Sequence, residues 1–197
     1  SRLLTEELFN GIENSVQFQL GNFTESAWAE TLNSSDFPEF FGLCSPVSFL
    51  LEPGELKTVE VRAVPALPAG QETAEISFRP TGETWKFRQA EPLSATEWLD
   101  FCAEDGCPLR VQLTNRTATS LPVRVSFQPE EFLLSPGEVR TLSLPLDDPS
   151  ILWEEERVSF SYDLEAGAFH TERRLEKACH SPLAGAALPA GQLRRPA

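Results

Sequence analysis

The chain has 197 residues, 41% of them hydrophobic, which is too apolar for disorder and long enough for two domains of about 80 to 95 residues. Thirty Asp and Glu against sixteen Lys and Arg give a net charge of −14 and a pI near 4.6, so the chain repels the phosphates of nucleic acids and anionic membranes. No apolar run reaches the roughly 18 residues that a spanning helix needs. The sequence therefore predicts no nucleic-acid partner and no membrane span.

The first half of the chain has the period of β-strands. In Ser15–Leu20 and again in Thr58–Val64, apolar residues alternate with polar ones, which places them on one face of a half-buried strand. The pair Pro53-Gly54 marks a turn, since Pro presets φ near about −65° and Gly accepts positive φ. Seven strands are predicted, near 3–9, 15–22, 26–32, 45–51, 55–64, 72–79 and 84–90.

The second half continues in the same way, after a predicted linker over Gln89–Thr96. Leu121–Phe127 alternates, and Pro136-Gly137 marks a turn between two strands. One helical turn is expected within Asp147–Glu156. Seven strands are again predicted, near 96–102, 109–114, 121–127, 130–134, 138–145, 156–163 and 168–176.

The two halves repeat each other. FLLEPGELKT (Phe49–Thr58) returns as FLLSPGEVRT (Phe132–Thr141), 83 positions later. Upstream, VQFQLGNFT (Val16–Thr24) resembles LRVQLTNRT (Leu109–Thr117), and downstream Ile76-Ser-Phe78 returns as Val158-Ser-Phe160. Because these segments recur in the same order, the chain is interpreted as a duplicated domain.

Seven short strands with turns every eight to twelve residues are typical of an immunoglobulin-like sandwich. The predicted fold class is all-β, with two tandem seven-stranded immunoglobulin-like β-sandwich domains at 1–92 and 93–180. Residues 181–197 lack strand periodicity and are expected to be a flexible tail or a docking segment. The Cys…Trp…Cys spacing of antibody domains is absent, so the architecture is predicted without that family.

Four cysteines occur, without the spacing of a zinc site. Cys102 and Cys107 flank a short Ala-Glu-Asp-Gly segment that could form a tight turn, so a disulfide between them is expected, with two inert buried thiols as the alternative. Cys44 and Cys179 either pair with each other or stay as free thiols. The chain contains no Met, which suits a start made by processing or by truncation, and together with the disulfide this predicts an extracytoplasmic location. Three Asn-x-Ser/Thr triplets, at Asn22, Asn33 and Asn115, are candidate glycosylation sites.

The sequence offers little for catalysis. His170 and His180 are the two histidines, and no nucleophile elbow, phosphate-binding loop or zinc-protease motif occurs. His170 is expected to face solvent on a strand, and Cys179-His180 point to opposite faces of an extended chain. The acidic residues at 147–148 and 154–156 lack the spacing of a calcium loop and are interpreted as a solvated cluster. No enzyme activity, metal or cofactor is predicted.

One strand stands out as a candidate for partner binding. In Trp85-Lys-Phe-Arg88, the apolar Trp85 and Phe87 alternate with the cationic Lys86 and Arg88. A strand like this at a sheet edge can pair its free N–H and C=O groups with another chain. Core packing is the ordinary alternative for Trp85, as it is for Trp28, Trp98 and Trp153.

Two segments, Ser45–Pro80 and Val111–Phe127, together with the two-domain layout, resemble the periplasmic chaperones of the chaperone–usher pilus pathway. That resemblance implies that the last strand of domain 1, Thr84–Ala90, completes an unfinished pilus subunit. Trp85 and Phe87 would then be the donated residues, and Lys86 would be a candidate anchor for the subunit's terminal carboxylate.

The close likeness of the two halves fits a rival interpretation better. Tandem modules resembling the major-sperm-protein or bacterial surface-repeat type share F-x-L-x-P-G-E followed by an alternating strand, and they serve as structural or adhesive spacers. The expected partner is therefore a protein, either a pilus subunit or another copy of a surface protein.

Overall fold

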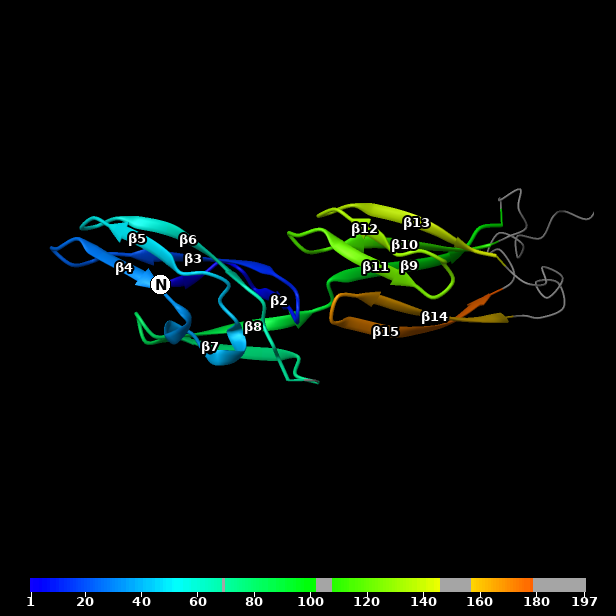
Figure 1. Ribbon diagram of the computed structural model, residues 1–197, viewed down its shortest axis with the longest axis horizontal. Coiled ribbons are helices and arrows are strands. Elements are labelled where there is room, and N and C mark those ends of the chain that lie inside the picture. Colours follow the sequence, from blue (N-terminus) through cyan, green and yellow to red (C-terminus); the bar gives the residue numbers. More distant parts are fainter. Residues whose placement is uncertain (69, 102–107, 146–156, 179–197) are drawn as a thin grey trace, which may run out of the picture.

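The computed structural model describes residues 1–68, 70–101, 108–145 and 157–178 (Figure 1). Within these residues the regular structure consists of strands and two 3₁₀ helices, η1 (Ser34–Asp36) and η2 (Glu39–Phe41). The predicted all-β class is confirmed. No helix among these residues has the length and apolarity to cross a bilayer. The helical turn predicted within 147–156 and the tail 181–197 lie outside the described residues.

The first half of the described chain forms one β-sandwich, here called the first sandwich. One of its sheets has the order β1-β3-β6, a second has the order β2-β8-β7, and β4 and β5 form a separate hairpin. The alternation of apolar residues explains why these segments are half-buried strands. The bounds are β1 (Arg2–Leu3), β2 (Glu7–Phe9), β3 (Asn14–Gly21), β4 (Trp28–Leu32), β5 (Val47–Leu51), β6 (Leu56–Ala63), β7 (Thr73–Phe78) and β8 (Glu83–Ala90).

The single first strand predicted over 3–9 is instead two short strands in different sheets. β1 pairs with β3 antiparallel, and β2 pairs with β8 in parallel. The chain crosses between the sheets at Leu4–Glu6, where the N–H groups of Leu4 and Thr5 both donate to the Gln17 carbonyl. Hydrophobic alternation cannot reveal such a crossing, because both strands keep the same period.

An aromatic cluster fills the first sandwich. The rings of Phe18 and Trp85 lie 4.8 Å apart, and those of Phe78 and Trp85 lie 4.7 Å apart in a stacked arrangement. The buried residues of this core all lie between Leu8 and Phe87 in the sequence, so residues 1–92 hold the core complete.

The second half of the described chain forms the second sandwich, in which sheet β13-β10-β9 packs on sheet β12-β11-β14-β15. All seven strands match the predicted ones to within a few residues. The bounds are β9 (Leu93–Leu99), β10 (Leu109–Asn115), β11 (Leu121–Val125), β12 (Phe132–Leu134), β13 (Val139–Leu144), β14 (Arg157–Ala166) and β15 (Phe169–Ala178).

The internal repeat is visible in a pair of identical corners. Asn22 of the first sandwich donates through Nδ2 to the carbonyls of Ser26 and Leu51, and Asn115 of the second donates to those of Thr119 and Leu134. Each asparagine also accepts, through Oδ1, from the backbone N–H and the hydroxyl of the threonine two residues later. Two unrelated folds would not share this pattern, so the two sandwiches are copies of one structure.

These corners give two of the three Asn-x-Ser/Thr triplets a structural role. Asn22 and Asn115 are 2% and 1% exposed, and both amide hydrogens of each are used in hydrogen bonds. Asn33 differs, because it is exposed and caps η1 with its side chain. Folding therefore hides Asn22 and Asn115 from modification and leaves Asn33 accessible.

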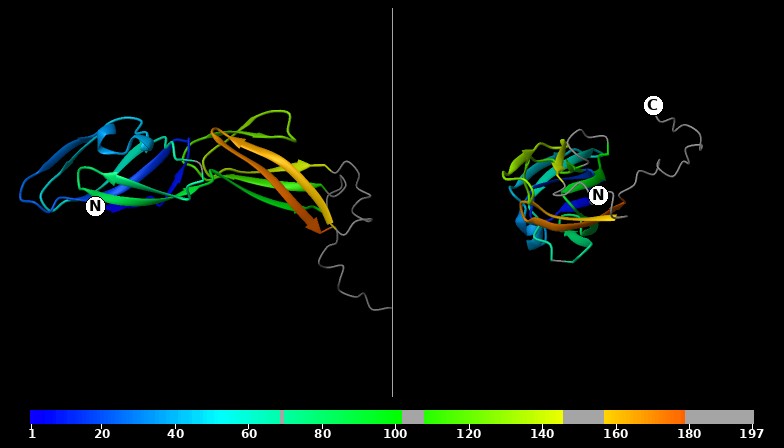
Figure 2. Two further views of the ribbon diagram at one scale, coloured as in Figure 1. Left: turned by 90° about the horizontal axis from the view of Figure 1, so that it is seen from below. Right: turned by 90° about the vertical axis from the view of Figure 1, so that its right-hand side faces the viewer.

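The two sandwiches stack end to end (Figures 1 and 2). The predicted linker over Gln89–Thr96 is wrong, since β8 runs to Ala90, β9 begins at Leu93, and Glu91 and Pro92 alone lie between them. A loop at the base of the first sandwich enters the second, where Ile12 belongs to the hydrophobic core. Gly11, at φ 67°, lies so close that a Cβ there would be 2.5 Å from the Ala168 methyl carbon.

Candidate functional site

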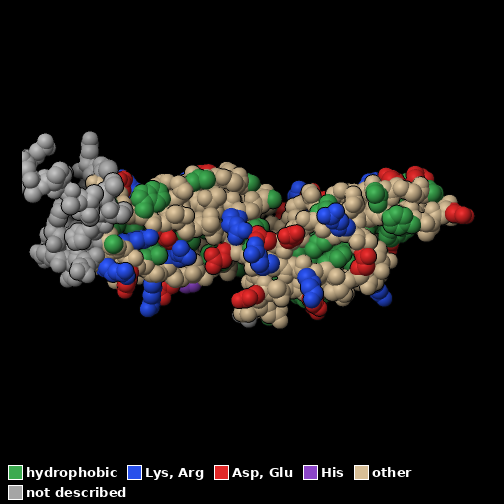
Figure 3. Space-filling model, turned by 180° about the vertical axis from the view of Figure 1, so that it is seen from behind, with side chains coloured by type: hydrophobic (Ala, Val, Ile, Leu, Met, Phe, Trp, Pro, Cys, Tyr) green, Lys and Arg blue, Asp and Glu red, His purple; other side chains and the backbone are tan. Residues whose placement is uncertain are grey.

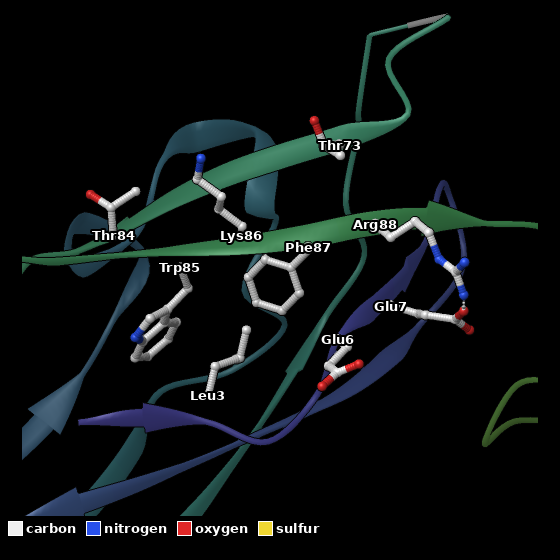
Figure 4. Close-up of a pocket in the computed structure, with 9 residues that line it drawn as sticks. All are labelled: Leu3, Glu6, Glu7, Thr73, Thr84, Trp85, Lys86, Phe87 and Arg88. Atoms are coloured by element: carbon white, nitrogen blue, oxygen red, sulfur yellow. Dashed lines mark hydrogen bonds and ion pairs between the residues drawn. The ribbon is translucent and has the colours of Figure 1, made fainter.

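An open groove of about 750 Å³ runs along β8 of the first sandwich (Figure 4). One wall is β8 and the other is the N-terminal segment that crosses between the sheets. Figure 3 shows apolar side chains at the surface of the first sandwich, bordered by basic and acidic ones. The lining residues are Leu3, Glu6, Glu7, Thr73, Thr84, Trp85, Lys86, Phe87 and Arg88.

The edge of β8 that faces this groove is only partly covered. β2 pairs with Arg88–Ala90 and with no earlier residue of β8. The Arg88 N–H points toward β2 and donates to the Glu6 carbonyl, whereas the next N–H, at Gln89, donates to Glu72 beside β7. Because strand groups alternate in direction, the main-chain groups of Thr84 and Lys86 point to the same side as those of Arg88. There, no described strand pairs with them.

All four residues predicted to bind a partner line the groove, but their side chains divide between two faces. Trp85 and Phe87 point inward, are 6% and 1% exposed, and form part of the core. In Figure 4 both hang from β8 toward Leu3 on the opposite wall. They therefore form the apolar floor of the groove and at the same time belong to the core.

The two cationic residues point outward and are paired. Lys86 Nζ lies 3.0 Å from Glu75 Oε1 on β7. Arg88 forms an ion pair with Glu7, whose other oxygen lies 2.7 Å from Nη2 of Arg116 in the second sandwich. The covered end of the groove thus carries an Arg88–Glu7–Arg116 bridge across the joint, while the open end has an exposed and weakly held Lys86–Glu75 pair.

The second sandwich closes the corresponding space with charged side chains. Leu3 pairs with Phe18, and Glu97 pairs with Val111, which occupies the position of Phe18 in the repeat. Glu97 is therefore the counterpart of Leu3.

Glu97 holds β9 against the opposite sheet through three side chains. Its carboxylate accepts from the Tyr162 hydroxyl at 2.7 Å and from Arg173 at 3.0 Å, and Lys177 donates to its main-chain carbonyl. Burial and this hydrogen bond raise the pKa of Tyr162. Long charged residues along β15, such as Arg174 and Glu176, also protect that strand from pairing. The space beside Glu97 is thus filled, although no described strand covers the outer edge of β15.

The other sequence candidates that lie within the described residues form no assembled centre. Cys44 has no disulfide partner among the described residues, and burial and the nearby Glu13 carboxylate raise the pKa of its thiol. His170 is exposed, 3.9 Å from both Asp163 and Glu165. The described ranges contain no cluster of His, Cys, Asp and Glu suited to a metal. Cys102, Cys107, Cys179, His180 and the acidic residues of 147–156 lie outside those ranges.

Sequence reasoning missed the far wall of the groove. Leu3 and Glu6 were assigned to a continuous first strand, whereas the crossing at Leu4–Glu6 is what leaves β8 uncovered before Arg88. The signal that could have revealed it is Thr5, whose hydroxyl accepts from the Gln17 N–H and fixes the crossing.

Comparisons with known proteins give likenesses in structure and none in sequence. No family model matches the chain, and no curated protein resembles it in sequence. Among solved structures it is similar to the CupB2 chaperone of Pseudomonas aeruginosa, with 12% identity over 89% of this chain and 99% of that chain, at a TM-score of 0.24. A TM-score this low supports no statement about the function of this chain.

Proposed function

We propose that this protein is a binding module that pairs an extended segment of another protein with the open edge of β8. The observation that carries this proposal is the uncovered stretch Glu83–Phe87, which presents main-chain donors and acceptors above an apolar floor. In strand addition, hydrogen bonds between the two main chains supply affinity, and every second side chain of the added strand packs on the apolar floor. Lys86 and Arg88 flank the incoming segment.

In its more specific form the module is an extracytoplasmic chaperone that holds a pilus subunit. The difference between the two copies supports this form, because an open groove in the first sandwich and a closed one in the second provide one site per molecule. The complex is therefore expected to have a one-to-one stoichiometry. Residues 1–92 and 93–180 would be its two domains.

A structural or adhesive module is the second candidate. The end-to-end stack favours it, because the two sandwiches join through only two residues of linker and a buried loop, as a stiff spacer requires. Such a module would self-associate or remain a monomer. It would not form a stable complex with a different protein.

A proline substitution tests strand pairing without disturbing the fold. Because the Lys86 N–H points into the groove and makes no bond to β7, Lys86→Pro removes one donor for the partner and leaves the β7–β8 ladder intact. Affinity capture from the native host, with identification of the bound chain, should lose its partner at least tenfold with this variant.

Glu75→Pro is the matched control. Glu75 lies opposite Lys86, its N–H points to the outer edge of β7, and its loss breaks the same ion pair. This variant should retain the partner. Equal capture by both variants, with circular dichroism showing both folded, would refute pairing at β8.

A further inference from the structure

The two sandwiches are copies, so each surface that forms their joint has a counterpart elsewhere on the molecule. The second sandwich enters the joint with its Arg116 corner, which consists of Asn115, Arg116 and the β14–β15 turn at Gly167 and Ala168. The first sandwich has the same corner at its free end, made of Asn22, Phe23 and the β7–β8 turn at Gly82 (Figure 1). The matching hydrogen bonds of Asn22 and Asn115 relate the two loops, and the turns correspond because each joins the last two strands of its sandwich.

In the joint, the Arg116 corner rests on the base of the first sandwich, formed by Glu7, Phe9, Gly11 and Ile12. Nη2 of Arg116 lies 2.7 Å from Glu7, its Nη1 donates to the Glu91 carbonyl, and its guanidinium lies 6.0 Å from the centre of the Phe9 ring. The turn touches this base while staying exposed, because a Cβ on Gly167 would meet Ile12 at 3.8 Å.

The counterparts in the first sandwich are bare. Phe23, at the position of Arg116, is 86% exposed. A Cβ on Gly82 would meet nothing within 4 Å. The side chains of Phe23 and Leu56 both lie over Gly21, since a Cβ there would be 2.8 Å from each of them. An exposed aromatic residue braced in this way is the kind of side chain that anchors an interface.

We infer that the Phe23 corner is a docking surface for the base of another β-sandwich of this kind, so that the internal joint is repeated in a head-to-tail stack. The occupant would supply a short loop with apolar side chains like Phe9 and Ile12. Phe23 would pack on the aromatic ring that Arg116 faces in the internal joint. Val139, the counterpart of Leu56, stays exposed in the internal joint, so contact is expected at Phe23 and at the turn more than at Leu56.

The chain itself provides a probe for this surface. Residues 1–92 contain the whole first core, and without the second sandwich their base is free. A fragment of residues 1–92 carrying Phe23→Asp offers that base and has no apolar corner of its own. Mixed with the full chain, whose base is covered, it should form a one-to-one complex in sedimentation velocity.

Two variants of the full chain decide the outcome. Phe23→Asp in the full chain should weaken the complex at least tenfold. Leu133→Asp, which places the same charge at an exposed apolar residue of the second sandwich, should leave it unchanged. Absence of a complex with a folded fragment, or equal binding by Phe23→Asp, would overturn the inference.

A second measurement needs no fragment. Arg116→Phe places a phenylalanine in the Arg116 corner, as Phe23 stands in the corner of the first sandwich. If a phenylalanine corner fits the base, the internal joint should persist. The NOE between the Ile12 methyl groups and the Gly167 α-protons should then remain. Loss of that NOE would show that a phenylalanine corner does not fit the base, and would overturn the inference. Neither experiment alters a residue that lines the β8 groove, so their results are separate from those on strand pairing.

Discussion

Asn115 places its carboxamide inside the second sandwich, between the β10–β11 loop and the end of β12. It donates two hydrogen bonds and accepts two, and its main-chain carbonyl accepts from Gly137. An alanine would leave the buried Thr117 N–H without its acceptor and would remove the bond to the Leu134 carbonyl. We therefore expect Asn115→Ala to lower the free energy of unfolding by about 3 kcal/mol, measured by urea denaturation.

Asn33→Ala provides the control for that measurement. Asn33 also accepts from the backbone, at the N-terminus of η1, but it is exposed to water. Its loss should cost about 1 kcal/mol. A cost at Asn115 no larger than at Asn33 would contradict the structural role of the buried corner.

Tyr162 is the single tyrosine of the chain, so its ionisation can be followed directly by tyrosinate absorbance. Burial and the hydrogen bond to Glu97 raise its pKa well above 10. The unfolded chain, with a pKa of about 10, loses this proton first, so stability is complete below pH 10 and falls as the pH rises further. Tyrosinate should appear together with loss of near-ultraviolet circular dichroism. Normal ionisation near pH 10 with the fold intact would refute this account.

Most strands were predictable from the sequence because their alternation is regular. β3 and β10 alternate over their whole length and β6 alternates from Thr58 onward, and the predicted ranges agree with the structure to within about two residues. The repeat was predictable for the same reason. The β1–β2 crossing was not, because it depends on which sheet offers a partner, and a linear pattern does not contain that information.

The candidate site was only half predictable. Alternation in Trp85–Arg88 correctly marks a strand with two chemical faces, yet the same alternation describes a buried core strand. What distinguishes β8 is the short length of β2 beside it. The sequence also could not show that Leu3 and Glu97 are counterparts, since one leaves a groove and the other closes it through Arg173 and Tyr162.

Ile12 connects the two sandwiches. It belongs to the first half of the sequence and to the core of the second. Ile12→Ala should destabilise the second sandwich by about 2 kcal/mol, because it removes buried methyl groups and leaves a cavity at the joint. Native-state hydrogen exchange should place this loss at β9, β14 and β15. An effect confined to the first sandwich would contradict the position of this loop.

The joint also explains why the predicted linker was wrong. Polar residues around Glu91–Pro92 suggest a flexible connection, but Arg116 binds both Glu7 and the Glu91 carbonyl and holds the segment in place. Such contacts join residues far apart in the sequence. The two sandwiches are consequently joined beside the groove on β8, because the Arg88–Glu7–Arg116 bridge lies at its covered end.

An incoming protein segment that pairs with β8 before Arg88 would form hydrogen bonds with the N–H groups of Thr84 and Lys86. Amide hydrogen exchange at these two residues measures that pairing. In the free protein both amides should exchange rapidly, whereas those of Trp85 and Phe87, bonded to β7, should be slow. With the captured partner bound, Thr84 and Lys86 should become protected. Protection already present in the free chain, or none gained in the complex, would contradict the claim.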